Sequence, residues 1–337
     1  MTGNLPASCN NMRQHLLGKK MLHGILLYLK NYFHNMEAMW QQLLQHIING
    51  DIKALARCIS LVENEAEGYE ELLQSLNTNT STKIIGITGP PGAGKSTLTD
   101  ALIGKLVKQE KKVGVLCVDP SSPFNFGSLL GDRIRMSEWY NNPNVFIRSL
   151  ATRGSLGGLH PKTIEITDVM KAAGFDYVII ETVGVGQSEV EIAGLADVTV
   201  VVLVPEGGDV IQTMKAGLME IADIFVVNKS DRPDADTFIN NLKMMLAPAF
   251  HNSNKIPIVK TVASEKKGIE ELKKEILECT EKQSGEKKYT MLAEKAWQLI
   301  QNKRMKNINK QQLKEEIEKR AKVGLRFNLY SFIESIS

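Results

Sequence analysis

The chain has 337 residues, of which 43% are hydrophobic and 23% charged, a balance typical of a globular protein with a sizeable core. Its net charge of +3 is too small to indicate nucleic-acid binding. The cysteines (Cys9, Cys58, Cys117 and Cys279) form no C-x-x-C pair, which argues against a disulfide framework or zinc site and favours a reducing compartment, the cytoplasm. No run of 18 apolar residues is present, so we expect neither a membrane span nor a membrane partner.

Residues 1–36 carry no acidic side chain and include the apolar stretch MLHGILLYLKNYF, from Met21 to Phe33. We interpret them as an N-terminal extension of uncertain role, an extra helix or a poorly ordered tail. A signal peptide is a weaker alternative, because the apolar stretch is short and lacks a small-residue cleavage site. An acid-poor transit peptide is also consistent with this composition.

Residues 37–78 have the pattern of a helical segment. The apolar residues expected to share one face of its first helix are Trp40, Leu43, Leu44, Ile47 and Ile48. Gly50 is expected to end that helix and Asp51 to cap the next one. A third helix is expected over about residues 69–76.

Seven strand-like runs follow within residues 79–280, and helical segments separate most of them. The runs are KIIGIT, KVGVLCVD, NVFIRSL, DYVIIET, VTVVVLVP, IFVVNK and IPIVKTVA. Several are continuously apolar, as strands buried on both faces usually are. The alternation predicts an α/β domain whose mostly parallel sheet is flanked by helices, with ligand-binding loops at the carboxyl ends of the strands.

Residues 281–337 have no strand pattern and are rich in charged residues at helical spacing. Such a segment is too long and too polar to pack wholly on the sheet. We interpret it as a helical arm for dimerisation, with a solvated C-terminal helix as the alternative.

The segment GPPGAGKS follows the first strand-like run and fits the phosphate-binding pattern G-x-x-x-x-G-K-[ST]. Its glycines let backbone N–H groups turn toward phosphates, and the helix that follows adds positive potential. Lys95 is expected to reach the β- and γ-phosphates, and Ser96 to bind Mg²⁺. The predicted phosphate contacts are Gly89, Pro90, Pro91, Gly92, Ala93, Gly94, Lys95, Ser96 and Thr97.

The segment NKSD, at the end of the sixth strand-like run, indicates that the base is guanine. The carboxylate of Asp231 would accept from the paired guanine donors, which adenine lacks, and such paired recognition discriminates strongly. Asn228 would brace the neighbouring loops, and the stem of Lys229 would lie against the base. The seventh run ends in a loop whose residues Val262, Ala263 and Ser264 are expected to offer a backbone N–H to guanine O6.

Further acids fall where a bound Mg²⁺ and the terminal phosphate would lie. Asp119 ends a strand and Asp132 follows in a glycine-containing loop, so either would supply a metal ligand, directly or through water. For Asp119, capping of a helix is the alternative. Glu181 ends the strand DYVIIET and is assigned to the metal site and to catalysis, with helix capping as its alternative. Gln187 is the candidate that orients the attacking water.

Taken together, seven motifs in this order resemble the methylmalonyl-CoA mutase-associated GTPases of the MeaB/ArgK type, in the G3E group of P-loop GTPases. The motifs are GPPGAGKSTL, VDPSSP, GSLLGDRIRM, TRGSLGGL, ETVGVGQSEV, GGDVIQTMKAG and VVNKSD. The resemblance extends from about Leu43 to the C-terminal helices. It implies a homodimeric GTPase that acts as a chaperone of an adenosylcobalamin-dependent acyl-CoA mutase, gating cofactor loading and protecting the mutase from inactivation.

The resemblance also implies roles for individual residues. Lys95 and Ser96 are the P-loop pair, and Asp231 recognises guanine. The metal site is lined by Asp119, Asp132 and Glu181. A further switch segment, residues 207–216 with Asp209 and Lys215, would communicate with the mutase. The cofactors implied are GTP or GDP and Mg²⁺.

Departures from the family pattern concern two loops. Phe124, Asn125 and Phe126 stand where relatives tend to have small polar residues and an extra glycine. Val210 and Thr213 stand where relatives typically have Glu and a small residue. These differences affect how the first switch would close and how the partner would be contacted.

Other functions remain open at the level of sequence. A metallochaperone GTPase of the same group would need a Cys/His cluster near the switches. A kinase or transport ATPase conflicts with the guanine reader Asp231. A scaffold that binds GTP without hydrolysing it is a further alternative. With no arginine finger evident, we expect slow intrinsic hydrolysis that the mutase accelerates, and the sequence does not identify which mutase is served.

Overall fold

The computed structural model describes residues 38–77, 81–119, 136–152, 159–182, 188–205, 216–246, 256–281, 285–305, 308–322 and 327–336. The chain divides into two compact units, Met1–Lys282 and Gln283–Ser337. No helix in the described ranges is long and apolar enough to cross a membrane.

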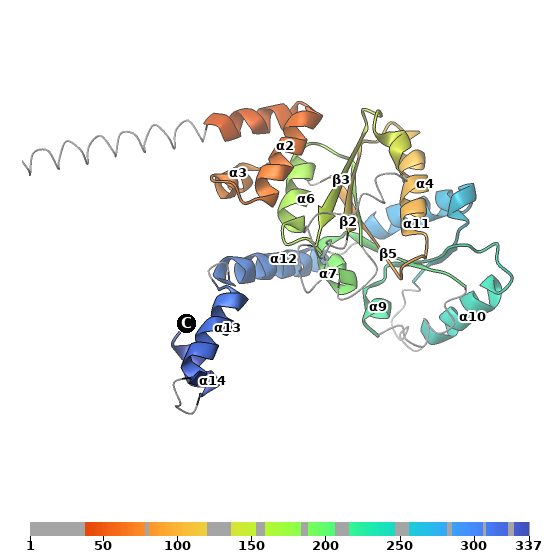
Figure 1. Cartoon of the computed structure of the whole chain (residues 1–337). Helices are drawn as coiled ribbons and strands as arrows, with labels where there is room; N and C mark the ends of the chain where they lie inside the picture. Colours follow the sequence, from red (N-terminus) through yellow and green to blue (C-terminus); the bar gives the residue numbers. More distant parts are fainter. Residues whose placement is uncertain are drawn as a thin grey trace, which may run out of the picture. The chain divides into compact units, whose positions relative to one another are not determined.

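The first unit is built on a seven-stranded sheet in the order β3-β2-β4-β1-β5-β6-β7 (Figure 1). Every neighbouring pair runs parallel. The strands are β1 (Lys83–Thr88), β2 (Val113–Asp119), β3 (Val145–Ala151), β4 (Tyr177–Glu181), β5 (Val198–Leu203), β6 (Ile224–Val227) and β7 (Ile258–Lys260). Six of the seven lie within the runs identified from sequence, β3 extends one residue past its run to Ala151, and the predicted α/β class is confirmed. The strand order reverses direction around β1, which places a ligand crevice at its carboxyl end.

Helices cover both faces of this sheet because the strands are apolar on both sides. On β5, Val198, Val200 and Val202 share one core with α4 (Lys95–Val107) and α11 (Ile269–Glu281). Val201 and Leu203 point the other way, into a core with α9 (Ala216–Ile221) and α10 (Ala235–Leu246). This alternation explains why the whole strand VTVVVL is buried. The second face also carries α6 (Thr163–Ala172) and α7 (Ser188–Leu195), next to β4 and β1 respectively.

The N-terminal helices follow the predicted boundaries. A helix covers residues 38–48, and α2 (Ile52–Glu63) and α3 (Tyr69–Ser75) come after it. Gly50 has a positive φ of 83°, and the Asp51 carboxylate accepts from Lys53 N (2.8 Å) and Ala54 N (3.1 Å), which caps α2.

One residue of the predicted apolar face lies outside the core. Ile48 is 51% exposed, whereas Trp40, Leu44 and Ile47 are buried. The buried stripe repeats through Trp40, Leu44 and Ile47, and Ile48 lies at its edge, in the last position of the helix. The hydrophobic core on this side of the helix therefore ends at Ile47, one residue before the helix does.

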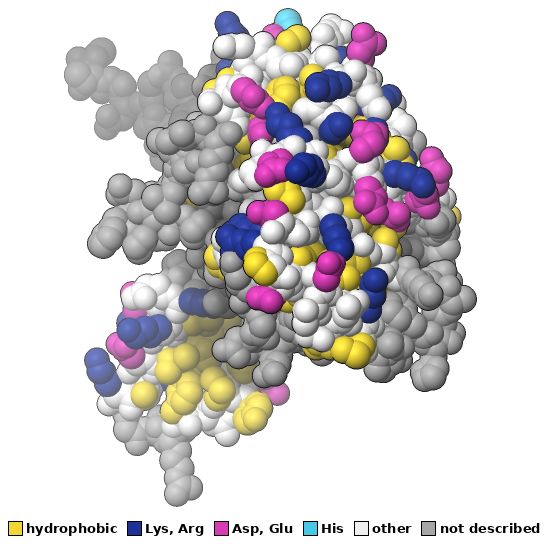
Figure 2. Space-filling view, turned by 90° about the vertical axis from the view of Figure 1, so that its right-hand side faces the viewer, with side chains coloured by type: hydrophobic (Ala, Val, Ile, Leu, Met, Phe, Trp, Pro, Cys, Tyr) yellow, Lys and Arg dark blue, Asp and Glu magenta, His cyan; other side chains and the backbone are white. Residues whose placement is uncertain are grey.

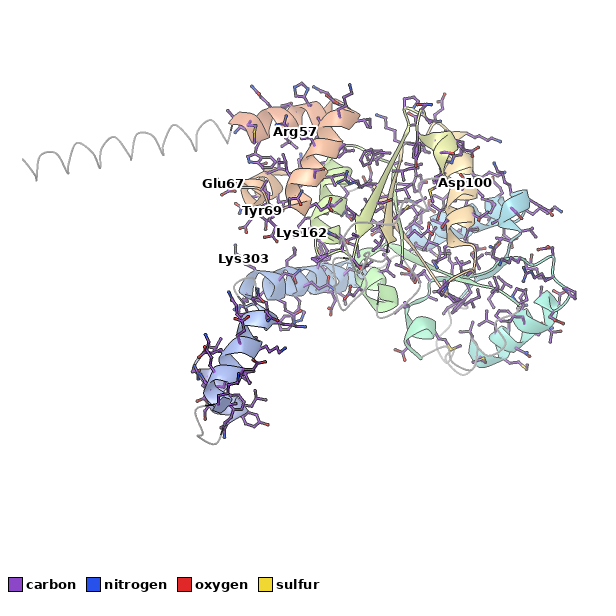
Figure 3. All side chains as sticks on the ribbon, viewed as in Figure 1. Arg57, Glu67, Tyr69, Asp100, Lys162 and Lys303 are labelled. Carbon is purple, nitrogen blue, oxygen red and sulfur yellow. The ribbon has the colours of Figure 1, made fainter. Side chains whose placement is uncertain are left out.

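A partly buried ionic group ties the N-terminal helices to α6. The ammonium of Lys162, just before α6, lies 3.0 Å from a Glu65 oxygen and 3.2 Å from a Glu165 oxygen. It also lies 4.9 Å from the ring centroid of Tyr69 in α3, and Figure 3 labels both residues where α3 and α6 pack together. Burial by itself lowers the pKa of Lys162, but Glu165, with hydrogen bonds to Glu65 and Tyr69, raises that pKa overall. The half-buried Lys162 therefore stays charged, and it is paired with acidic groups.

The second unit consists of α12 (Gly285–Met305), α13 (Lys310–Lys322) and α14 (Leu329–Glu334). Asn309 caps α13 through its side chain, which accepts from Gln311 N at 2.8 Å. In α14, Phe332 is buried, and its ring contacts the Phe327 ring and the Arg320 guanidinium. The helical character expected for residues 281–337 is present, divided among these helices.

The turn between β1 and α4 contains three glycines with positive φ. Gly89 has φ 137°, and a Cβ there would lie 2.1 Å from the Val202 carbonyl oxygen of β5. Gly92 has φ 76°, and a Cβ on this residue would meet nothing within 4 Å. Gly94 has φ 89°, and its Cβ would meet the Asn228 amide nitrogen at 2.4 Å. Two of the three glycines are therefore fixed by close approach as well as by φ.

We predict that Gly89→Ala destabilises the chain far more than Gly92→Ala. Both substitutions force a left-handed residue, at about 1–2 kcal/mol. Gly89→Ala adds a collision with a strand carbonyl, which costs roughly 1–3 kcal/mol more or shifts the backbone. Urea unfolding without ligand measures both variants, and an equal loss in the two would show that Val202 does not constrain the turn.

Candidate nucleotide-binding site

The glycine turn and the start of α4 form a cradle at the carboxyl end of β1. Lys95 is the first residue of α4, and its ammonium donates to the carbonyl oxygens of Gly89 (2.8 Å) and Pro90 (3.1 Å). The lysine side chain thus folds back over its own turn and places a buried positive charge at the helix N-terminus. A cation combined with the positive end of a helix is the arrangement that binds phosphate groups.

A carboxylate lies directly beside this cradle. Glu181 is the last residue of β4, and parallel pairing sets it against Ile87 of β1. Its side chain is only 4% exposed. Its Oε1 accepts from the Ser96 hydroxyl at 2.6 Å, and its Oε2 accepts from the Thr99 hydroxyl at 3.0 Å. The predicted pair of Ser96 and Glu181 is therefore brought together.

The chemistry of this pair fits Mg²⁺. A serine hydroxyl and a carboxylate are hard oxygen donors, and both lie next to the phosphate cradle. Of the other predicted metal ligands, Asp119 ends β2 but its side chain is outside the described set, and so is the whole of Asp132. No cluster of three His, Cys, Asp or Glu side chains with metal-binding geometry occurs in the described ranges. Of the four predicted metal ligands, Ser96 and Glu181 are therefore the two whose side chains the structure describes.

Asn228 joins the phosphate cradle to the loop after β7. It follows β6 and is 3% exposed, and its amide nitrogen donates to Ala93 O at 2.9 Å. Its amide oxygen accepts from the Thr261 hydroxyl at 3.0 Å and from Ala263 N at 3.1 Å. With both ends of the amide in use, Asn228 holds three loops in one arrangement.

The neighbouring residues face outward at the predicted base site. Lys229 has a positive φ of 55°, and its ammonium donates to Gly92 O at 3.0 Å, so its stem crosses the turn. Asp231 is exposed two residues further on. The Asp231 carboxylate lies near enough to Lys267 to affect the pKa of that residue. Glu265 raises the pKa of Lys267 most, and the negative charge of Asp231 adds to the increase. The Asp231 carboxylate is therefore accessible to a ligand.

The three predicted donors to guanine O6 differ in their surroundings. Val262 N donates to Lys267 O at 3.2 Å, and Ala263 N donates to Asn228, as above. Ser264 is exposed in the same loop. The N–H groups of Val262 and Ala263 thus donate to Lys267 and Asn228, and that of Ser264 takes part in neither bond. The contact with guanine O6 stays a prediction.

Some predicted residues fall outside the described ranges, and some contacts were not predicted. Gln187, Asp209 and Lys215 belong to the first group. Thr99 belongs to the second, although its position three residues after Ser96 on a helix puts both hydroxyls on one face. Thr182, after β4, is another such residue: its hydroxyl lies 2.9 Å from that of Thr88 and links the ends of β4 and β1.

Three known proteins are similar to this chain in sequence. A Pyrococcus abyssi protein is 49% identical over 248 residues, which are 72% of this chain and 76% of the archaeal protein. The GTPase ArgK of Escherichia coli is 38% identical over 247 residues, 70% of this chain and 74% of ArgK. The methylmalonic aciduria type A homolog of Mus musculus, described as mitochondrial, is 40% identical over 205 residues, 56% of this chain and 49% of the mouse protein.

A solved structure and a family profile cover more of the chain. The crystal structure described as a LAO/AO transport system kinase matches with a TM-score of 0.61 and 27% identity, over 89% of this chain and 98% of that protein. The family described as methylmalonyl Co-A mutase-associated GTPase MeaB matches residues 55–321. With this match, and with the phosphate cradle, the Ser96–Glu181 pair and the Asn228 bridge in place, the chain belongs to the MeaB family of methylmalonyl-CoA mutase-associated GTPases.

Proposed function

We propose that this protein binds and hydrolyses GTP with Mg²⁺, as a chaperone of an adenosylcobalamin-dependent acyl-CoA mutase, with methylmalonyl-CoA mutase as the expected partner. It would gate loading of the cofactor and protect the mutase from inactivation. The observation that carries the nucleotide part is the Glu181 carboxylate, buried against Ser96 at the phosphate cradle. Membership of the MeaB family carries the mutase part.

The phosphates would be held by the turn and by Lys95. The Lys95 ammonium already donates to two carbonyl oxygens of the turn, so incoming phosphate oxygens would compete with neutral acceptors for a full positive charge. Hydrogen bonds to ionised acceptors are the stronger kind, and the exchange therefore favours phosphate. The remaining predicted contacts would come from backbone N–H groups of residues 89–97.

The base would lie between Lys229 and Asp231. Asn228 fixes the chain at the end of β6, and the residues that follow it then present a stem and an exposed carboxylate. Two donors of guanine match the two oxygens of Asp231, whereas adenine would leave that carboxylate without donors.

Mg²⁺ would be held by Ser96 and Glu181, joined by the predicted ligands Asp119 and Asp132. When bound, the metal would neutralise charge on the phosphates, which is the main requirement of phosphoryl transfer. The residues of this chain would position the triphosphate, and Gln187 is proposed to orient water. GTP hydrolysis would be slow in the protein alone. The mutase would raise its rate by acting on residues 207–216, which include Asp209 and Lys215.

We further propose that the second unit forms a homodimer. Large apolar side chains are exposed on it, among them Trp297 (59%) on α12 and Tyr330 (79%) on α14. Figure 2 shows hydrophobic side chains gathered in the lower part of the view, which holds α13 and α14. An apolar surface of this kind on a charged helical segment supports burial against a second copy.

The guanine assignment predicts a change of base preference. Asp231→Asn should lower the affinity for GTP by roughly 100-fold, because two hydrogen bonds to a charged acceptor are lost, and should favour xanthosine triphosphate. Asp234→Asn removes an exposed carboxylate from the same loop and serves as the control. Competition binding with the two nucleotides measures the change, and an unaltered preference in Asp231→Asn would refute the assignment.

The mutase assignment predicts stimulation by the partner. Adding purified adenosylcobalamin-dependent methylmalonyl-CoA mutase should raise GTP turnover at least about tenfold, since partner-supplied groups commonly account for much of the rate in such enzymes. The Asp231→Asn variant, assayed with GTP and the mutase, gives the background rate of GTP turnover. Turnover that is the same with and without the mutase would contradict the chaperone role while leaving GTP hydrolysis intact.

The dimer predicts a mass of twice one chain in sedimentation analysis. Trp297→Ala should weaken association by about 30-fold or more, the effect of losing a buried aromatic anchor. Lys303→Ala, an exposed truncation on the same helix, should leave association unchanged. A wild-type chain that sediments as a monomer would exclude the dimer.

A further inference from the structure

Three side chains at the phosphate cradle form a buried cluster: the Glu181 carboxylate with the hydroxyls of Ser96 and Thr99. The two hydroxyls are three residues apart on α4 and so lie on one helix face. Each hydroxyl takes one carboxylate oxygen, Ser96 at 2.6 Å and Thr99 at 3.0 Å. The rotation of the carboxylate about its own axis is therefore fixed by two donors from a single helix.

The Thr99 hydroxyl has two acceptors within reach. Besides Glu181 Oε2, it lies 3.0 Å from the carbonyl oxygen of Lys95, one helical turn back. A hydroxyl carries one hydrogen and can donate to one of them at a time. The backbone carbonyl is the usual acceptor for threonine within a helix, whereas a bond to a carboxylate is stronger.

Because the Thr99 hydroxyl has two acceptors within reach, the Glu181 carboxylate can leave it for another ligand. Thr99 is fully buried, so a hydroxyl left without an acceptor would be costly. With Glu181 in place, the hydroxyl donates to Oε2. When Glu181 turns toward a metal or its water, the hydroxyl can donate to Lys95 O instead, and no buried donor is left unsatisfied.

We propose that Thr99 is a positioning residue that orients Glu181 and thereby sets the Mg²⁺ requirement of nucleotide binding. The inference rests on the proposed function, because it assigns Glu181 to the metal site. Thr99 itself touches neither nucleotide nor metal in this proposal. Its effect is transmitted through the Oε2 atom of Glu181 alone.

The test compares Thr99→Val, which keeps the side-chain shape and removes the hydroxyl, with Thr99→Ser, which keeps the hydroxyl. Thr167→Val is a matched control: Thr167 in α6 is also fully buried, and its hydroxyl also donates one turn back, to Thr163 O at 2.6 Å. Thr99→Ala removes the same hydroxyl with less bulk and replaces Thr99→Val if the latter does not melt cooperatively.

The readout is the release rate of fluorescently labelled GDP at graded free Mg²⁺. We expect Thr99→Val to lower the Mg²⁺ concentration for half-maximal retention by roughly tenfold, because the hydrogen bond that holds Glu181 in its metal-free arrangement is lost. For Thr99→Ser and Thr167→Val, this Mg²⁺ concentration should stay within about twofold of the wild-type value, because both variants keep a hydroxyl at residue 99 that can bond to Glu181. In excess chelator all variants should release GDP at one rate.

Each other outcome has a definite meaning. If Thr99→Val follows the wild-type Mg²⁺ curve, or if Thr99→Ser shifts as far as Thr99→Val, the hydroxyl does not position Glu181 and the inference is wrong. An equal shift in Thr167→Val would reduce the effect to general destabilisation and overturn the inference too. If wild-type release is independent of Mg²⁺, the metal assignment of the proposed function fails, and the inference fails with it.

Discussion

The parallel register between β1 and β4 is the constraint on which the candidate site depends. It pairs Ile87 with Glu181, so the strand that leads into the phosphate cradle lies beside the strand that ends in the acid. The glycine turn then brings α4 back over the same edge, where its first two turns present Ser96 and Thr99 to that acid. A shift of one residue in this pairing would point the carboxylate to the opposite face of the sheet.

Much of the fold could be predicted because its signals are local. The seven strands are runs of Val and Ile with neighbouring turns, and Gly50 and Asp51 mark the helix boundary through backbone conformation and capping. The phosphate cradle is likewise a contiguous motif with one conformational solution. These features depend on a few adjacent residues, which is what a single sequence displays.

What the sequence did not reveal depends on residues far apart in the chain. The sequence predicts that Asn228 braces neighbouring loops, but its individual partners follow from tertiary packing. The contacts of Lys162 with Glu65, Glu165 and Tyr69 follow from tertiary packing as well. The exposure of Ile48 depends on where the helix ends relative to its neighbours. Thr99 is a different case, because helical spacing from Ser96 was sufficient to suggest it once Glu181 was assigned to the same cluster.

The Asn228 bridge also has a consequence for how the chain folds. Its three side-chain hydrogen bonds join residues 135, 33 and 35 positions apart along the sequence. Contacts of such separation form only after the intervening chain has been ordered, at the entropic cost of closing long loops. The base-binding side of the site therefore cannot exist as a local fragment. A nascent chain that has not yet added β7 would lack Thr261 and Ala263, and with them the hydrogen bonds that hold the Asn228 amide oxygen beside the predicted base site.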